Sequence, residues 1–184
     1  MEVCEVMPLL AFYKYTDKEK TEIVKSLTII CDTREKKSKH ITDWFDKQKI
    51  PYKSKALSNG DYSFFIPKNE KLNIDRDLYF DKEIMIERKA SLDEISGNFT
   101  QNRTRFEEEM ATFDGKKYLI IENSNYSDIA NGNYKTKLSK KAFLASIHTF
   151  NHRYNLQIIF MPNSDYTAMY IYGTFVYFLR ELLR

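Results

Sequence analysis

The sequence predicts an α/β fold with three layers, in which helices flank a mixed central sheet. Short apolar runs typical of buried strands alternate along the chain with segments whose apolar residues recur at helical spacing. A length of 184 residues, with 42% hydrophobic and 30% charged residues, is typical of one globular domain and not of a disordered or fibrous chain. We therefore expect a domain over residues 27–184, preceded by an N-terminal extension over residues 1–26.

Two helices are expected in the first third of the chain. The pair Thr16-Asp17 is a typical N-terminal cap, which predicts a short helix over residues 18–26. A second helix is expected before Pro51, because apolar residues recur at helical spacing there. These residues are Ile41, Trp44, Phe45 and Ile50.

Four strands are expected between and after these helices. The first is a continuous apolar run that ends at Asp32 and contains Cys31, which we interpret as a buried thiol. The second and third form an antiparallel hairpin, because Ser58-Asn59-Gly60 between them is a typical turn. An extended polar loop over residues 67–82 leads to the fourth. The predicted strands are 27–31, 52–57, 62–66 and 83–88.

The second half of the chain alternates helices with buried strands. A helix begins at Ser91, with Asp93 and Glu94 in its first turn, where acidic side chains are favourable. Short apolar runs bounded by polar residues then predict two further strands. The later expected helices are 102–113, 139–150 and 164–183, and the expected strands are 117–122 and 156–161.

The charge distribution is compatible with a nucleic-acid partner. The net charge is only +3, but residues 34–55 hold eight basic and three acidic residues. A second cluster has no acidic residue and consists of Lys135, Lys137, Lys140 and Lys141. Together the clusters fit a surface that follows phosphates, although each alone fits an ordinary solvated surface equally well.

No segment of the sequence is typical of a membrane span or a signal peptide. The longest uncharged stretch, over residues 166–179, has 14 residues, whereas a helix needs about 20 to cross a bilayer. Glu2 and Glu5 stand where a signal peptide would be basic. We expect an intracellular protein with no membrane partner, cytoplasmic if bacterial or phage and nuclear if eukaryotic.

Acidic residues stand at the ends of the expected strands. Asp32 follows the first strand, Asp61 opens the third, and Glu87 lies near the end of the fourth. Lys89 comes two residues after Glu87, so on a strand both side chains point to the same face. Two carboxylates and an ammonium group that converge in this way are suited to bind a divalent cation and orient a water molecule. The plain alternative for Glu87 and Lys89 is a surface ion pair.

The surrounding residues narrow this interpretation. Gly60-Asp61-Tyr62, then Ile86-Glu87-Arg88-Lys89, then Asp93 after three residues, follow the pattern GD-Xn-ERK-X3-D. This pattern resembles the XPF family of structure-specific endonucleases, and the similarity extends over residues 27–160. Further matching segments are Asp32-Thr33-Arg34-Glu35, Arg105-Phe106-Glu107 and Leu119-Ile120-Ile121-Glu122. The sequence departs from the family in the longer insert between Asp61 and Glu87, and it contains no tandem helix-hairpin-helix module.

The resemblance implies a restriction-endonuclease-like fold and metal-dependent hydrolysis of branched, flap or junction DNA, in repair or recombination. It implies that Asp61, Glu87 and the main-chain carbonyl of Arg88 bind Mg²⁺ or Mn²⁺, and that Lys89 orients the attacking water. The Arg88 side chain is expected either to contact the scissile phosphate or to anchor the acidic cluster. Asp93 is expected either to hold Lys89 and Arg88 in place or simply to favour the helix N-terminus.

Other residues are expected to support this site. Asp32 and Glu35 would line the pocket as additional carboxylates. DNA contacts are expected from basic residues near it, namely Arg34, Arg103, Arg105, Lys137, Lys140 and Lys141. Arg103 and Arg105 fit equally well as partners of acidic residues on their own helix. The functional alternatives are a catalytically silent DNA-binding or scaffold subunit and a sequence-specific nuclease of the restriction type. His148 and His152 are spaced like a zinc pair but lack a third ligand, so we interpret them as surface or helix-end residues.

The last predicted helix is apolar on more than one face. One stripe is formed by Ala168, Ile171, Phe175, Phe178 and Leu182, and a second group by Tyr166, Met169, Tyr170, Val176 and Tyr177. A helix packed on its own sheet needs only one apolar stripe, so the second group predicts a homodimer with these helices at the interface. The alternative is that the N-terminal residues Leu9, Leu10, Phe12 and Tyr13 cover the second group.

Overall fold

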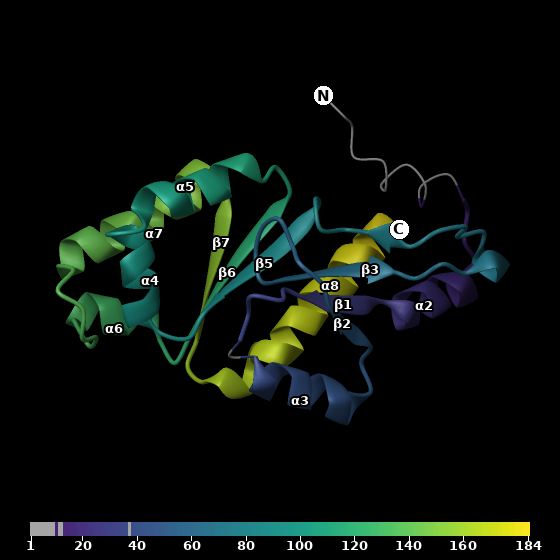
Figure 1. Ribbon diagram of the computed structural model, residues 1–184, viewed down its shortest axis with the longest axis horizontal. Helices are drawn as coiled ribbons and strands as arrows, with labels where there is room; N and C mark the ends of the chain where they lie inside the picture. The colour runs from purple at the N-terminus through teal and green to yellow at the C-terminus, as the bar shows by residue number, and fades with distance from the viewer. Residues whose placement is uncertain (1–9, 11–12, 37) are drawn as a thin grey trace. The chain divides into compact units, whose positions relative to one another are not determined.

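A computed structural model describes Leu10, residues 13–36 and residues 38–184 of the chain. The described residues form seven strands of one mixed sheet in the order β2-β1-β3-β5-β6-β7, with β4 paired to β3. Helices flank this sheet (Figure 1), so the predicted α/β fold class is confirmed. Backbone proximity divides the chain into two compact units, the first comprising residues 1–84 and 168–184 and the second residues 85–167.

The first unit contains the predicted N-terminal helix, α2 (Asp17–Ser26). Thr16 caps it in a capping box: the Thr16 N–H donates to Glu19 Oε2 at 2.7 Å, and the Glu19 N–H donates to Thr16 Oγ1 at 3.3 Å. Ile23 and Val24 of this helix are buried. The segment that the sequence places in an extension therefore contributes apolar side chains to the first unit.

Strand β1 (Thr28–Cys31) is the centre of this unit, and the predicted hairpin beside it is wrong. The chain passes from β1 through α3 (Lys39–Gln48) to β2 (Tyr52–Ser54), which pairs with β1 in parallel. Strand β3 (Tyr62–Ile66) pairs antiparallel with β1 on its other edge. The two strands of the expected hairpin are thus separated by β1.

Hydrogen bonds at the carboxyl end of β1 explain the error. The connection between β2 and β3 passes around this end instead of turning tightly. The Lys55 N–H donates to the Cys31 carbonyl at 3.1 Å, and the Asp32 N–H donates to the Asp61 carbonyl at 2.8 Å. Cys31 itself is buried as expected, and burial, followed by the charge of Glu35, raises the pKa of its thiol to about 12.

The segment predicted as a polar loop, residues 67–82, has structure of its own. It contains a short 3₁₀ helix, η1 (Glu70–Leu72), and strand β4 (Leu78–Tyr79), which pairs with β3. Its apolar side chains are buried, namely Leu72, Ile74, Leu78 and Phe80. The Phe80 ring stacks on Phe64 of β3 with 4.5 Å between the ring centroids.

The final helix, α8 (Thr167–Leu182), packs on these strands through the predicted apolar stripe. The Phe175 and Phe178 rings lie 5.3 and 6.1 Å from the Phe64 ring, measured between centroids. Val176, from the second apolar group, is also buried and lines a pocket of about 460 Å³ together with residues of α2. Helix α2 therefore covers part of the second group.

Three residues of the second group stay exposed, of which Met169 and Tyr177 belong to the first unit and Tyr166 to the second. Tyr166, Met169 and Tyr177 are 55%, 51% and 63% exposed. The alternative cover by the N-terminal segment is only partly visible, because Leu9 and Phe12 lie outside the described residues. Of the other two, Leu10 is buried and Tyr13 is exposed.

The second unit alternates strands and helices as the sequence predicts. Its core joins aromatic rings from three helices, and Phe99 and Phe106 lie 5.0 and 5.2 Å from Phe150 between centroids. Helices α4 to α7 gather on one side of the parallel strands β6 and β7 (Figure 1). The elements are β5 (Ile84–Lys89), α4 (Leu92–Phe99), α5 (Arg103–Thr112), β6 (Lys116–Glu122), α6 (Tyr126–Asn131), α7 (Lys140–Tyr154) and β7 (Leu156–Met161).

Helix α6 was not predicted from the sequence. It has six residues, of which only Ile129 is buried, so it carries too few apolar positions to show a helical period. Across the part of the chain that the structure describes, none of the helices combines the length and apolar character needed to cross a lipid bilayer.

Candidate active site

In the first unit, the Asp32 carboxylate is fully engaged by neighbouring donors. Its Oδ1 accepts from the Arg34 N–H at 2.7 Å and from Arg34 Nε at 2.8 Å. Its Oδ2 accepts from Arg34 Nη2 at 3.0 Å and from the Leu57 N–H at 2.6 Å. The same Arg34 nitrogen also donates to the Leu57 carbonyl at 2.8 Å. This network ties the end of β1 to the connection between β2 and β3.

The electrostatics of Asp32 follow from these contacts. The carboxylate is fully buried, whereas the Arg34 side chain is 62% exposed. Burial alone would raise the pKa of Asp32, but the hydrogen bonds from Arg34 and from the Leu57 amide outweigh it and hold the pKa below its ordinary value. Asp32 is therefore an ionised structural group whose lone pairs are occupied, which favours a supporting role over direct catalysis. These hydrogen bonds favour a structural role for Arg34 over the expected DNA contact.

Asp61 and Glu35, the other candidate carboxylates of the first unit, are both half-buried. Asp61 directly precedes β3 and follows Gly60, whose φ of 71° lies in the left-handed region that glycine tolerates best. The Glu35 N–H donates to the Asp32 carbonyl at 3.2 Å. Glu35 thus lies in the turn that begins at Asp32.

In the second unit, Glu87 and Lys89 lie on the same face of β5, as their spacing predicts. Lys89 Nζ donates to Glu87 Oε1 at 2.5 Å. The two side chains are only 9% and 12% exposed, so the contact is not an ordinary surface ion pair. Removing charged groups from water is costly, which makes a nearly buried pair of this kind a candidate for function.

Arg88, between them, points to a different partner. Its Nη2 donates to Glu122 Oε2, at the end of β6, at 2.6 Å. Both side chains are almost fully buried, at 5% and 1% exposed. Of the two roles left open for Arg88, this contact supports the anchoring of an acidic group. Glu122 was not predicted as a site residue. Two signals were available for it: like Asp32 it ends an apolar strand, and it closes the segment Leu119-Ile120-Ile121-Glu122 of the family resemblance.

Asp93 lies in the first turn of α4, as predicted, and binds a backbone segment. Its Oδ1 accepts from the Lys135 N–H at 2.8 Å and from the Thr136 N–H at 3.0 Å. Among the described residues, its hydrogen bonds do not reach the side chains of Lys89 or Arg88. The orienting role expected for Asp93 thus receives no support from its contacts.

The basic residues predicted to bind DNA fall into two groups in the second unit. Arg103 Nε donates to Glu107 Oε1 at 3.0 Å, and its Nη1 donates to Ser146 Oγ at 3.2 Å, so it stabilises its own helix and α7. The others are exposed, namely Arg105, Lys137, Lys140 and Lys141. The exposed group remains suited to contact phosphates.

The histidines do not form a metal site with their neighbours. His148 Nε2 lies 3.0 Å from the Tyr126 hydroxyl, which accounts for its position on the surface. Across residues 13–36 and 38–184, no three His, Cys, Asp or Glu side chains lie close enough together to bind a metal ion. Of the predicted carboxylates, Asp61 belongs to the first unit and Glu87 to the second.

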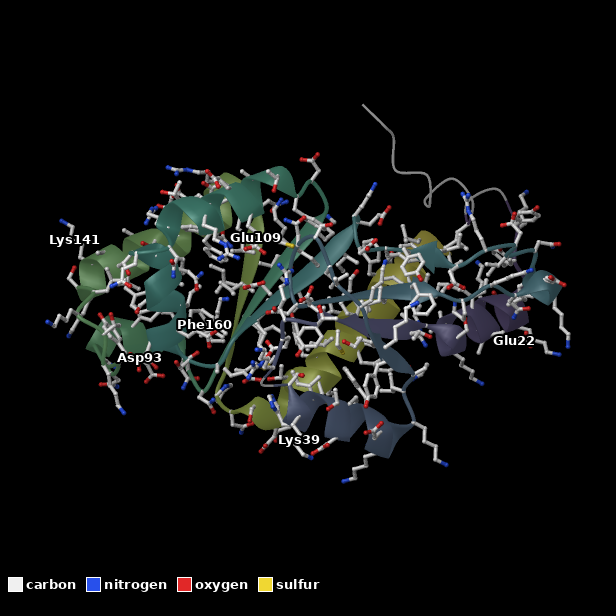
Figure 2. All side chains as sticks on the ribbon, viewed as in Figure 1. Glu22, Lys39, Asp93, Glu109, Lys141 and Phe160 are labelled. Atoms are coloured by element: carbon white, nitrogen blue, oxygen red, sulfur yellow. The ribbon has the colours of Figure 1, made fainter. Side chains whose placement is uncertain are left out.

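The model of the ERCC4 domain family matches residues 31–174, which include all of the candidate catalytic residues. No curated protein matches the sequence. Figure 2 shows the side chains on the ribbon, with Asp93 and Lys141 labelled on the second unit.

Two solved structures share the fold. The chain is similar to XPF from Aeropyrum pernix in complex with DNA, with a TM-score of 0.60 and 15% identity over 84% of this chain. It is also similar to XPF from Aeropyrum pernix alone, with a TM-score of 0.57 and 17% identity over 80% of this chain. The chain covers 65% and 59% of the length of these proteins, which is less than two thirds in each case.

Proposed function

Because the chain belongs to the ERCC4 domain family, we propose that it is a metal-dependent endonuclease that hydrolyses phosphodiester bonds in branched, flap or junction DNA. The observation that carries this proposal is the nearly buried Glu87–Lys89 pair at the end of β5, within the matched segment. A similar solved structure is a complex with DNA, which supports DNA as the partner.

The types of ligand that the family resemblance implies suit a hard divalent cation. Asp61, Glu87 and the main-chain carbonyl of Arg88 would supply oxygen ligands, which suit Mg²⁺ or Mn²⁺ better than zinc. This ligand set contains only two acidic side chains. It is therefore compatible with the finding that, among the described residues, no three His, Cys, Asp or Glu side chains lie close enough together to bind a metal ion. When bound, the cation would lower the pKa of a water ligand and polarise the phosphate.

The chain's own groups would orient the reactants. Lys89, whose Nζ donates to Glu87 Oε1 at 2.5 Å, would direct the attacking water and balance charge on the phosphate oxygens. The buried Arg88–Glu122 pair would fix β5 so that Glu87 and Lys89 keep their geometry. The Asp32–Arg34 network would likewise fix the segment that ends at Asp61. In-line attack would leave a 5′-phosphate and a 3′-hydroxyl.

We also propose that the protein forms a homodimer through the exposed face of α8. Met169 and Tyr177 give this face an exposed apolar character that a partner would cover. Gly173 lies in the same helix, and a Cβ added to it would meet nothing within 4 Å, so there is space for a second helix to approach.

The deciding experiment compares cleavage of labelled linear duplex, flap and four-way junction DNA of matched sequence, with Mg²⁺ and with EDTA. We expect the wild-type protein to cut branched DNA only when Mg²⁺ is present. The Glu87→Gln variant should cleave none of the substrates but should still bind DNA. A wild-type chain that binds every substrate and cuts none would identify a silent subunit. Cleavage of linear DNA at one sequence would identify a nuclease of the restriction type.

A further inference from the structure

Asp93 fixes the backbone of a lysine-bearing loop in the second unit. Its Oδ1 receives the adjacent N–H groups of Lys135 and Thr136, at 2.8 and 3.0 Å. Hydrogen bonds to an ionised acceptor are stronger than those between neutral groups. Because both donors reach one oxygen, the interaction fixes the direction as well as the position of the loop.

The loop that Asp93 holds presents its lysines outward. It connects α6 to α7, and burial alternates along it: Tyr134, Thr136 and Leu138 are half-buried, whereas Lys135 and Lys137 are exposed. The Tyr134 hydroxyl donates to the Leu138 carbonyl at 2.9 Å, and the Tyr134 ring packs edge-on against Phe143. The inward residues therefore anchor the loop on the core and leave the ammonium groups to the solvent.

We propose that Asp93 is a positioning residue, which holds this loop against α4 so that Lys135 and Lys137 contact DNA phosphates in a fixed arrangement. The inference rests on the proposed function, since it requires that the chain binds DNA. Helix α4 begins three residues after Lys89, the last residue of β5. Asp93 thereby links the lysine loop to the segment that carries Glu87 and Lys89.

Three substitutions separate this role from a catalytic one. Asp93→Asn keeps a side-chain oxygen that can accept from both amides, whereas Asp93→Ala removes the acceptor. Glu94→Ala is the matched control, because Glu94 lies in the same turn and is also exposed. Its Oε2 accepts from the Ala90 N–H at 2.9 Å, and it makes no hydrogen bond to the loop among the described residues.

Two measurements report on the loop and on DNA separately. Hydrogen exchange of the Lys135 and Thr136 amides, without DNA, should be faster in Asp93→Ala and unchanged in the other two variants. The dissociation constant for duplex DNA should rise about tenfold in Asp93→Ala, and the salt slope should fall by about 0.9 for each phosphate that a lysine no longer neutralises. Glu94→Ala should keep both the affinity for DNA and the rate at saturating DNA of the wild type, because its side chain bonds to the Ala90 N–H and not to the loop.

Several results would overturn the inference. One is a loss of rate at saturating DNA in Asp93→Asn that matches the loss in Asp93→Ala, because Asp93 would then act on the chemistry. Another is faster exchange in Asp93→Ala with unchanged DNA affinity, because the loop would then be irrelevant to binding. A wild-type chain that binds no DNA would overturn the proposed function together with this inference, which distinguishes that failure from the other two.

Discussion

The Asp32–Arg34 network allows a stability prediction with a calculable size. Asp32→Ala leaves the Leu57 N–H, now 2.6 Å from Oδ2, without its acceptor in a buried position. An unsatisfied buried amide costs about 1–3 kcal/mol. The hydrogen bonds from Arg34 contribute less to stability than those of a fully buried ion pair would, because the Arg34 side chain is 62% exposed and water can replace its partner. We expect a total loss of about 3 kcal/mol, which lowers the melting temperature by roughly 10 °C.

Urea and thermal unfolding, followed by circular dichroism at pH 7, would measure this loss. Asp32→Ala, Arg34→Ala and the double variant form a cycle whose coupling energy isolates the pair. Asp43→Ala is the control, since its partner Lys39 lies 2.7 Å away in an exposed pair, with side chains 57% and 86% exposed. That variant should lose less than about 0.5 kcal/mol. If Asp32→Ala lost no more than Asp43→Ala, the structural role of Asp32 would be refuted.

The same network predicts a pH dependence with a defined sign. The pKa of Asp32 is lowered on folding from its ordinary value of 3.8. Its contribution to stability is therefore complete above pH 3.8 and is lost as the pH falls through the folded-state value. The stability difference between wild type and Asp32→Asn should shrink as the pH drops below 3.8. A difference that stayed constant down to acid denaturation would contradict this assignment.

The remaining predictions concern activity, binding and assembly. Lys89→Ala should lower the cleavage rate by about 10²–10⁴-fold with a smaller effect on metal affinity, whereas a mere ion-pair partner would leave the rate unchanged. Charge reversal of Lys137, Lys140 and Lys141 should weaken DNA binding and reduce the salt slope by about 0.9 for each phosphate left without its lysine. An unchanged slope would assign these three lysines to ordinary solvated surface. Met169→Glu with Tyr177→Glu should convert a dimer to a monomer in light scattering without unfolding it, and a wild-type monomer at micromolar concentration would refute the dimer.

Local signals in the sequence predicted most elements, because the cause of each lies within a few residues. The capping box at Thr16 and the apolar runs of β1 and β6 are of this kind. The parallel pairing of β2 was not predictable in this way, since a turn signal says nothing about which strand a segment will pair with. The pairing depends on contacts between segments that are distant in the chain, such as the hydrogen bond that the Lys55 N–H donates to the Cys31 carbonyl.

In the candidate site, too, contacts between neighbours in the sequence were predictable and contacts between distant segments were not. The shared face of Glu87 and Lys89 follows from the two-residue period of a strand, and their ion pair confirms it. The partners of Asp93 and Arg88 lie more than thirty residues away, in the loop after α6 and at the end of β6. Spacing along the chain carries no information on such contacts, so it did not identify Glu122 as the partner of Arg88.

The first unit is discontinuous along the chain, and this affects the order in which the protein folds during synthesis. Residues 85–167 form one uninterrupted unit, which can close its core as soon as they leave the ribosome. Strands β1 to β4 emerge earlier but wait for α8, whose Phe175 completes the packing around Phe64. We therefore expect the reverse of the usual order, in which the N-terminal part folds first. Until α8 is translated, the Phe64 ring of β3 lacks the cover that Phe175 and Phe178 give it.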